Sequence, residues 1–240
     1  MLGIALHFGV PLEELKQANP GVDPQFLSVG ARLIIPVNAD NPAGLPTPTP
    51  VPLTVGTPFC APATDGSAVC LVTVTNPGSQ AVEAVSVWLA LENGEAYNVE
   101  ALNDLLPAGS TTVAVARFAP PAPPRPRAAA RLLRALPVDE KRQQQRYLSV
   151  ALNETKTTIA VDGRSARVVG EATVNVEQAG QIWVVAVAYD DQGRPVGARR
   201  WEAETPASGG QTVSFAFTLY SIGPRIARVV LSAEAHAAGN

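Results

Sequence analysis

The sequence predicts a mainly β protein in which two tandem antiparallel β-sandwiches follow a small α+β segment. Three observations support this fold class. Proline accounts for 22 of the 240 residues and charged residues for only 16%, and valine, alanine and threonine are frequent, which favours strands and loops over helical bundles. The chain after residue 58 repeats itself at an offset of about 100 residues. The first 36 residues instead carry short helical patterns followed by one strand.

The N-terminal segment, residues 1–37, predicts two short helices and a strand. Gly9 suits the end of the first helix, and Pro11 suits the first turn of the second. Leu15 lies at helical spacing from the apolar residues on either side of it. Residues 31–36 predict a short strand that is closed by a proline.

This segment resembles the lysin motif (LysM) family. The matching residues are Leu2, Ile4, Ala5, Phe8, Gly9, Leu15, Asn19, Pro20, Leu27, Val29, Gly30, Leu33, Ile35 and Pro36. Members of the family fold as strand, helix, helix, strand and bind N-acetylglucosamine-containing glycans such as peptidoglycan or chitin. The resemblance therefore implies a glycan partner. The residues it implies as glycan-binding are Asn19, Pro20, Gly21, Pro24, Leu27, Val29 and Gly30.

The family's opening strand and its Gly-Asp-Thr loop would precede Leu2, whereas Met1 lies inside the pattern. We therefore expect that the gene start is placed too late and that a longer natural chain carries the missing strand and an export signal. The alternative is a two-helix cap on the rest of the chain. If the chain is complete as written, we expect weak or no glycan binding, because only one side of the family's sugar groove remains. A segment below roughly 40 residues also rarely buries enough apolar surface to fold alone.

The remaining residues predict a linker followed by the two sandwiches. Proline, threonine and valine with almost no charge over residues 38–58 predict an extended, polyproline-like linker. The first sandwich is expected over residues 59–137 and the second over 148–236, with a connection over 138–147 between them.

The internal repeat supports both sandwiches. An Asn and a Gly are 18 residues apart at 76–94 and again at 175–193. Short Val, Ala and Thr runs with Asx-Gly or Gln-Gly turns are typical of antiparallel sandwiches. Both copies resemble the immunoglobulin-like modules that follow lysin motifs in bacterial envelope proteins. Trp88 and Trp183 lie in the middle of predicted strands and are expected in the two cores.

Residues 127–136 fit two secondary structures. They are rich in helix formers and place Arg127, Arg131 and Arg134 on one helical face. The repeat, however, aligns them with residues 225–233, whose β-branched side chains favour a strand. We therefore expect strands in both copies.

The two cysteines, Cys60 and Cys70, flank an Asp-Gly turn signal at Asp65 and Gly66. A turn there brings the thiols together, and the LysM resemblance implies an oxidising location outside the cytoplasm. We therefore expect a disulfide; the alternative is a pair of buried free thiols.

Candidate catalytic residues are scarce. The two histidines, His7 and His236, lie in the terminal segments, and no motif of a serine hydrolase, phosphate loop or zinc protease occurs. The close carboxylates are Glu13 with Glu14, Asp139 with Glu140, Asp190 with Asp191, and Glu202 with Glu204. The Asp-Asp-Gln-Gly sequence at 190–193 favours a hairpin turn over a Ca²⁺ or sugar-cleaving site. We expect no enzymatic activity, no cofactor and no resident metal.

Net charge is −3, and the one charge asymmetry is a basic concentration after residue 124. Its members are Arg125, Arg127, Arg131, Arg134, Lys141, Arg142 and Arg146. It is either a solvated sandwich face or a surface that attracts anionic wall polymers. Without interleaved aromatic residues we expect no nucleic-acid partner. No apolar run is long enough to predict a transmembrane segment.

The sequence therefore predicts a non-catalytic, extracellular or cell-envelope protein that binds peptidoglycan or a related N-acetylglucosamine polymer and displays two immunoglobulin-like modules. A second hypothesis is an adhesive or assembly scaffold, whose modules bind envelope proteins while the N-terminal segment is vestigial. A third is an accessory part of a wall hydrolase, which lacks a recognisable catalytic constellation here.

Overall fold

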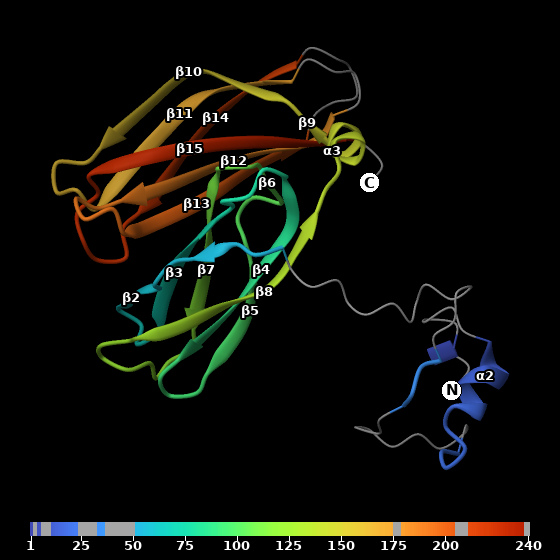
Figure 1. Cartoon of the computed structure of the whole chain (residues 1–240). Coiled ribbons are helices and arrows are strands. Elements are labelled where there is room, and N and C mark those ends of the chain that lie inside the picture. Colours follow the sequence, from blue (N-terminus) through green and yellow to red (C-terminus); the bar gives the residue numbers. More distant parts are fainter. Residues whose placement is uncertain are drawn as a thin grey trace. The chain divides into compact units, whose positions relative to one another are not determined.

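The computed structural model describes residues 1, 4–5, 11–23, 33–36, 51–174, 179–204 and 211–237. The chain forms two compact units, Met1–Thr49 and Pro50–Asn240. The described residues are mainly β, and their strands pair antiparallel (Figure 1).

The N-terminal unit is built around helix α2 (Leu12–Gln17), which follows Pro11. Leu15 of this helix is fully buried beside Ala5, and further apolar side chains pack partly against the two. The expected strand over 31–36 is not formed in its described part, residues 33–36, which have no regular secondary structure. No described residue of this unit forms a strand with which it could pair.

The larger unit begins with a first sheet pair, which we define as β1 to β8. Its strands are β1 (Thr54–Val55), β2 (Phe59–Pro62), β3 (Ala68–Thr75), β4 (Val82–Leu91), β5 (Ala96–Glu100), β6 (Leu105–Leu106), β7 (Thr111–Phe118) and β8 (Ala128–Pro137). In one sheet β3 pairs with β1, β2 and β7; in the other β4 pairs with β5, β6 and β8. Alternate residues of both sheets, including Val72, Val87 and Phe118, form a buried core between them.

The second sheet pair comprises β9 to β15 and is connected to the first by helix α3 (Glu140–Arg146). Its strands are β9 (Tyr147–Leu148), β10 (Val150–Ile159), β11 (Ser165–Val174), β12 (Ala179–Tyr189), β13 (Pro195–Glu204), β14 (Gln211–Tyr220) and β15 (Arg228–Ala237). One sheet has the order β10-β11-β14 and the other β13-β12-β15-β9. Ile182, Phe215 and Leu219 lie in the core that these sheets enclose.

Corresponding strands of the two copies have the same partners. β4 pairs with β5 and β8, as β12 pairs with β13 and β15, and β3 pairs with β7 as β11 pairs with β14. The hairpins after β4 and β12 both turn at a glycine with positive φ, 90° at Gly94 and 76° at Gly193. Residues with a side chain rarely adopt a positive φ, so this backbone requirement explains why both hairpins have glycine at the turn.

The structure settles one ambiguous segment and corrects another. Residues 128–137 form β8, so the strand prediction for 127–136 is confirmed and the helical alternative is wrong. Residues 51–58, which we predicted as part of the linker, instead pack on the first sheet pair. The backbone N–H of Val51 donates to Ala135, and Leu53 and Val55 cover the core. Three alternating apolar residues, Val51, Leu53 and Val55, compensate here for the surrounding prolines.

The prediction that Trp88 and Trp183 lie in the cores is wrong. Both are only half-buried, because their strand neighbours occupy the core positions and the indoles point the other way. β12 is buried on both faces: its even-numbered residues line the second core, and Val185, Val187 and Tyr189 pack against the first sheet pair. The two sheet pairs therefore share an apolar contact, in which β3 and β7 face β12 and β13.

Candidate functional site

The end of α2 is fixed by the side chain of Asn19. Its Nδ2 donates to the backbone oxygens of Leu15 at 2.8 Å and Ile34 at 2.6 Å, and its Oδ1 accepts the Ile34 N–H at 2.7 Å. Asn19 is buried, so these three bonds form away from water. One amide thus holds residues 33–36 against the helix end. In this geometry Asn19 positions the segment and has no free N–H for a sugar.

Pro20 and Gly21 form an exposed turn next to Asn19. The N–H of Val22 donates to the Asn19 carbonyl at 3.1 Å, and proline followed by glycine suits the two central positions of such a turn. A Cβ at Gly21 would meet no atom within 4 Å. Ile34, which Asn19 clamps, is 67% exposed. The exposed Pro20–Gly21 turn and the exposed Ile34 side chain are thus both adjacent to the buried Asn19 amide.

Four of the expected glycan-binding residues lie outside the described residues. They are Pro24, Leu27, Val29 and Gly30. His7 lies outside them as well.

Residues 3–36 match the LysM domain. This LysM segment indicates binding to peptidoglycan or other N-acetylglucosamine-containing glycans, and LysM domains are typical of cell-envelope and extracellular proteins. No curated protein shows a match to this chain.

A disulfide joins Cys60 of β2 to Cys70 of β3. The turn between them is stabilised by Asp65, which accepts hydrogen bonds from the hydroxyl and the N–H of Ser67 and pairs with Arg117. These contacts lower the pKa of Asp65 to about 2, the Ser67 hydroxyl contributing most. An oxidised cysteine pair is consistent with the location that the LysM segment indicates.

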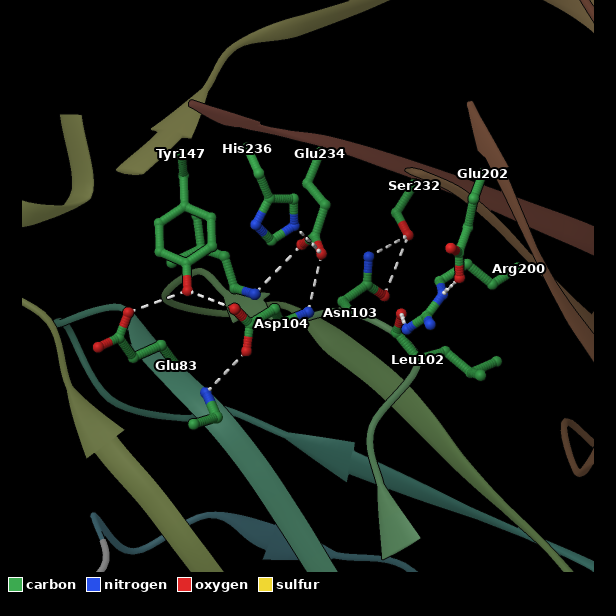
Figure 2. A network of polar contacts seen from close by, with 12 residues as sticks. Glu83, Leu102, Asn103, Asp104, Tyr147, Arg200, Glu202, Ser232, Glu234 and His236 are labelled. Atoms are coloured by element: carbon green, nitrogen blue, oxygen red, sulfur yellow. Dashed lines mark hydrogen bonds and ion pairs between the residues drawn. The ribbon is translucent and has the colours of Figure 1, made fainter. Parts of the chain in front are cut away.

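A polar network joins the two sheet pairs beside their apolar contact (Figure 2). Buried Glu234 of β15 accepts the N–H of Asp104 at 2.8 Å and the N–H of Leu105 at 3.1 Å, and lies 3.3 Å from the Nε2 atom of His236. Nearby, Asn103 bonds to the hydroxyl of Ser232. The loop before β6 is therefore held by side chains located about 130 residues later in the chain.

The connection between the sheet pairs is fixed by a second part of the network. The Tyr147 hydroxyl lies 2.9 Å from Glu83 and 2.7 Å from Asp104, and Arg146 pairs with Glu83 at 2.8 Å. Burial raises the pKa of Tyr147 well above its usual value, and hydrogen bonding to Asp104 and Glu83 raises it further, so the phenol stays protonated. Arg146, together with Arg142 at 3.6 Å, compensates the negative charge of the buried Glu83 carboxylate.

Trp183 packs against the polar network on the same face of β12 as Val185 and Val187. Arg200 lies 3.9 Å over its ring, and His236 lies with its ring centre 4.3 Å away. Arg200 also donates to Glu202 at 2.6 Å and to the carbonyl of Leu102 in the first sheet pair at 3.3 Å. These partners explain why an indole outside the core is still half-buried.

A cavity of about 480 Å³ lies beside the network. It is lined by Leu105, Gln143, Gln144, Tyr147, Leu148, Ser149, Val150, Ala233 and Glu234. Its one carboxylate, that of Glu234, already accepts two backbone N–H groups.

The paired carboxylates have structural partners in most cases. Asp139 caps α3 by accepting the N–H of Arg142, and Glu13 pairs with Lys16. Asp190 is buried in the β12–β13 hairpin and accepts the backbone N–H and the guanidinium of Arg194. Burial opposes ionisation of Asp190, but the hydrogen bonds from Arg194 outweigh it and its pKa is lowered.

Among the described residues, no three His, Cys, Asp or Glu side chains gather closely enough to hold a metal ion. In the same part of the chain, no helix has both the length and the hydropathy needed to span a bilayer.

The basic concentration divides into two groups in the structure. Arg142 and Arg146 of α3 neutralise Glu83, and Arg134 of β8 pairs with Glu100 at 2.7 Å. Arg131 of β8, and Arg125 and Arg127 just before it, form no ion pair with a described residue.

Proposed function

We propose that the chain is a non-catalytic, extracellular cell-envelope protein that binds peptidoglycan or a related N-acetylglucosamine polymer through the LysM segment. The observation that carries the proposal is the LysM match at residues 3–36. The disulfide between Cys60 and Cys70 supports the location, because disulfides persist in oxidising compartments. Each sheet pair is an immunoglobulin-like module on this proposal, supported by the shared strand pairing of the two copies.

On this proposal the sugar contacts the exposed surface around the Asn19 clamp, by which we mean the three hydrogen bonds of the Asn19 side chain to Leu15 and Ile34. Pro20 and Gly21 offer backbone groups, and Ile34 offers an aliphatic patch for the apolar face of a pyranose ring. Asn19 acts indirectly by keeping the turn and Ile34 together. This arrangement suits a neutral sugar, because hydrogen bonds and apolar contact supply the recognition.

Co-sedimentation with insoluble peptidoglycan tests the proposal. At about 150 mM salt, where attraction between exposed charges is largely screened, we expect the full chain to pellet, a soluble chitin oligomer to compete, and residues 51–240, which contain both sheet-pair cores, to stay in solution. The variant Gly21→Glu is the sharpest test, because the space around Gly21 accepts a side chain while the added chain covers the turn. It should weaken binding at least about tenfold, which corresponds to roughly 1.4 kcal/mol. Glu13→Gln is the control, since it changes an exposed α2 residue by one charge.

Three results would contradict the proposal in different ways. Equal pelleting of residues 51–240 would move the binding into the sheet pairs. Unchanged binding of Gly21→Glu would remove the turn from the site. Release of soluble fragments from labelled peptidoglycan by the purified chain would show that it is an enzyme.

A further inference from the structure

β4 pairs with β5 on one side and with β8 on the other (Figure 1). The face of this sheet that points away from the first core contains Trp88. Val87 and Leu89 point into the first core, so the indole between them lies on the opposite side. The strand registers place Asn98 of β5 and Arg131 of β8 directly beside Trp88. Asn98 and Arg131 are both exposed, so this row of side chains faces solvent.

Two arginines on this face keep their positive charge uncompensated. Arg127 and Arg131 are both exposed. Arg127 lies one residue before β8, and its carbonyl accepts the Glu92 N–H, so the pairing with β4 continues to it and alternation puts the two arginines on the same side. Neither forms an ion pair with a described residue. Arg134, farther along the strand, differs because it pairs with Glu100.

The guanidinium of Arg131 is held in place without using its hydrogen-bond donors. It lies 4.7 Å over the Trp88 ring. No described residue accepts a hydrogen bond from the Arg131 side chain, so its five N–H groups remain available beside the ring. Those donors match the two oxygens of a carboxylate, and a planar cation that is already positioned loses less side-chain entropy on binding one.

The second sheet pair contains the same kind of contact, but there the guanidinium also donates hydrogen bonds to other residues. Arg200 lies over Trp183, but its donors already bind Glu202 and the Leu102 carbonyl. Arg200 therefore serves the contact between the sheet pairs, whereas Arg131 has the same support and no hydrogen-bonding partner in the described chain. This difference separates a structural arginine from one that is available to a ligand.

We propose that the outward face of β4, β5 and β8 binds the carboxylate groups of an acidic glycan, with Arg131 and Arg127 as the cations and Trp88 as the positioning residue. The proposal rests on the proposed function, because it takes the ligand to be carboxylate-bearing peptidoglycan. A step of four residues in extended chain puts the two arginines about 13 Å apart, which suits successive carboxylates of one polymer better than a single small anion. Asn98 adds an amide that can bond to sugar hydroxyls beside the charged row.

The test uses the full chain and insoluble peptidoglycan freed of attached phosphate polymers, at about 20 mM salt, where exposed charges are weakly screened. Saturating chitin oligomer occupies the LysM segment, so the remaining binding reports on the arginine face. We expect Arg127→Gln combined with Arg131→Gln to raise the dissociation constant about tenfold. Amidation of the peptidoglycan carboxyl groups should weaken binding of the natural chain by a similar factor.

The matched control is Arg167→Gln combined with Arg228→Gln. It removes the same charge from exposed positions of the second sheet pair, and Arg228 also lies over a ring, 4.2 Å from that of Tyr189. Equal weakening by both double variants would show general charge attraction and overturn the proposal. Unchanged binding of the Arg127 and Arg131 variant, or of amidated peptidoglycan, would overturn it as well. Failure of the LysM assignment gives a different result: chitin oligomer has no effect while the dependence on carboxyl groups persists.

Discussion

Glu234 accepts a hydrogen bond of 2.8 Å from the backbone N–H of Asp104, although 130 residues separate them in the chain. This bond crosses from β15 of the second sheet pair to the loop before β6 of the first. It lies next to the apolar contact that Leu71 and Val113 make with β12. The two sheet pairs are thus joined by directional hydrogen bonds as well as by apolar burial, a combination that fixes their relative orientation.

Replacing Glu234 by glutamine tests how much the polar network contributes to this contact. A glutamine retains one acceptor oxygen, so one of the two N–H groups, that of Asp104 or that of Leu105, faces an NH₂ group instead. A buried donor without an acceptor costs about 1–3 kcal/mol. We therefore expect the free energy of unfolding, measured in urea, to fall by about 2 kcal/mol.

The control for this prediction is Glu204→Gln. Glu204 is exposed on β13, so its replacement should change the free energy of unfolding by less than about 0.5 kcal/mol. Equal stabilities of the Glu234 and Glu204 variants would mean that the network adds nothing beyond apolar burial.

The strands followed from the sequence more readily than the contact between the sheet pairs. Alternating residues and repeated glycine turns predicted β4 and β12, and the repeat decided β8 against its own helix propensity. The run Ile182–Tyr189 is continuously apolar, which is typical of a strand buried on both faces. We assigned Trp183 to the core because it lies in the middle of its predicted strand. Sequence alone does not identify the surface that covers a strand of this kind.

The LysM segment shows what a family resemblance can and cannot supply. It pointed to Asn19 and the turn that follows, and the structure places both at the end of α2. The resemblance did not reveal whether Asn19 contacts the sugar itself or positions other residues, because that depends on the hydrogen-bond partners of its side-chain amide. The bonds to Ile34 join positions 15 residues apart, and no local pattern reveals them.

Asp190 makes the stability of the second sheet pair dependent on pH. Its folded pKa is below the ordinary value of 3.8, so the stabilisation is complete well above that pH and is lost as the pH falls through the folded pKa. Asp190→Asn should lower the free energy of unfolding at pH 7 and reduce its loss between pH 5 and pH 2. Urea titrations at several pH values check this. Asp191→Asn, an exposed neighbour, should leave the profile unchanged; a profile that Asp190→Asn does not alter would contradict the prediction.

The disulfide should stabilise the first sheet pair. Cys60 and Cys70 are 10 residues apart, and closing a loop of this length lowers the entropy of the unfolded chain by an amount equivalent to about 3 kcal/mol. Cys60→Ala combined with Cys70→Ala should therefore lower the free energy of unfolding by about that amount. The natural chain in reducing buffer provides the comparison, and it should unfold at nearly the same urea concentration as the variant. A variant as stable as the oxidised chain would contradict the expectation.

Asn19→Ala should disrupt the LysM segment while the sheet pairs stay intact. The substitution removes all three hydrogen bonds of the clamp and leaves the Ile34 N–H and the carbonyls of Leu15 and Ile34 without their present partner. Each lost bond costs about 1 kcal/mol or more, which is a large fraction of what so small a core supplies. Amide hydrogen exchange should show the Ile34 N–H losing protection, with glycan binding reduced in parallel. Gln17→Ala, at an exposed position of α2, is the control, and continued protection of Ile34 in the Asn19 variant would show that the clamp is dispensable.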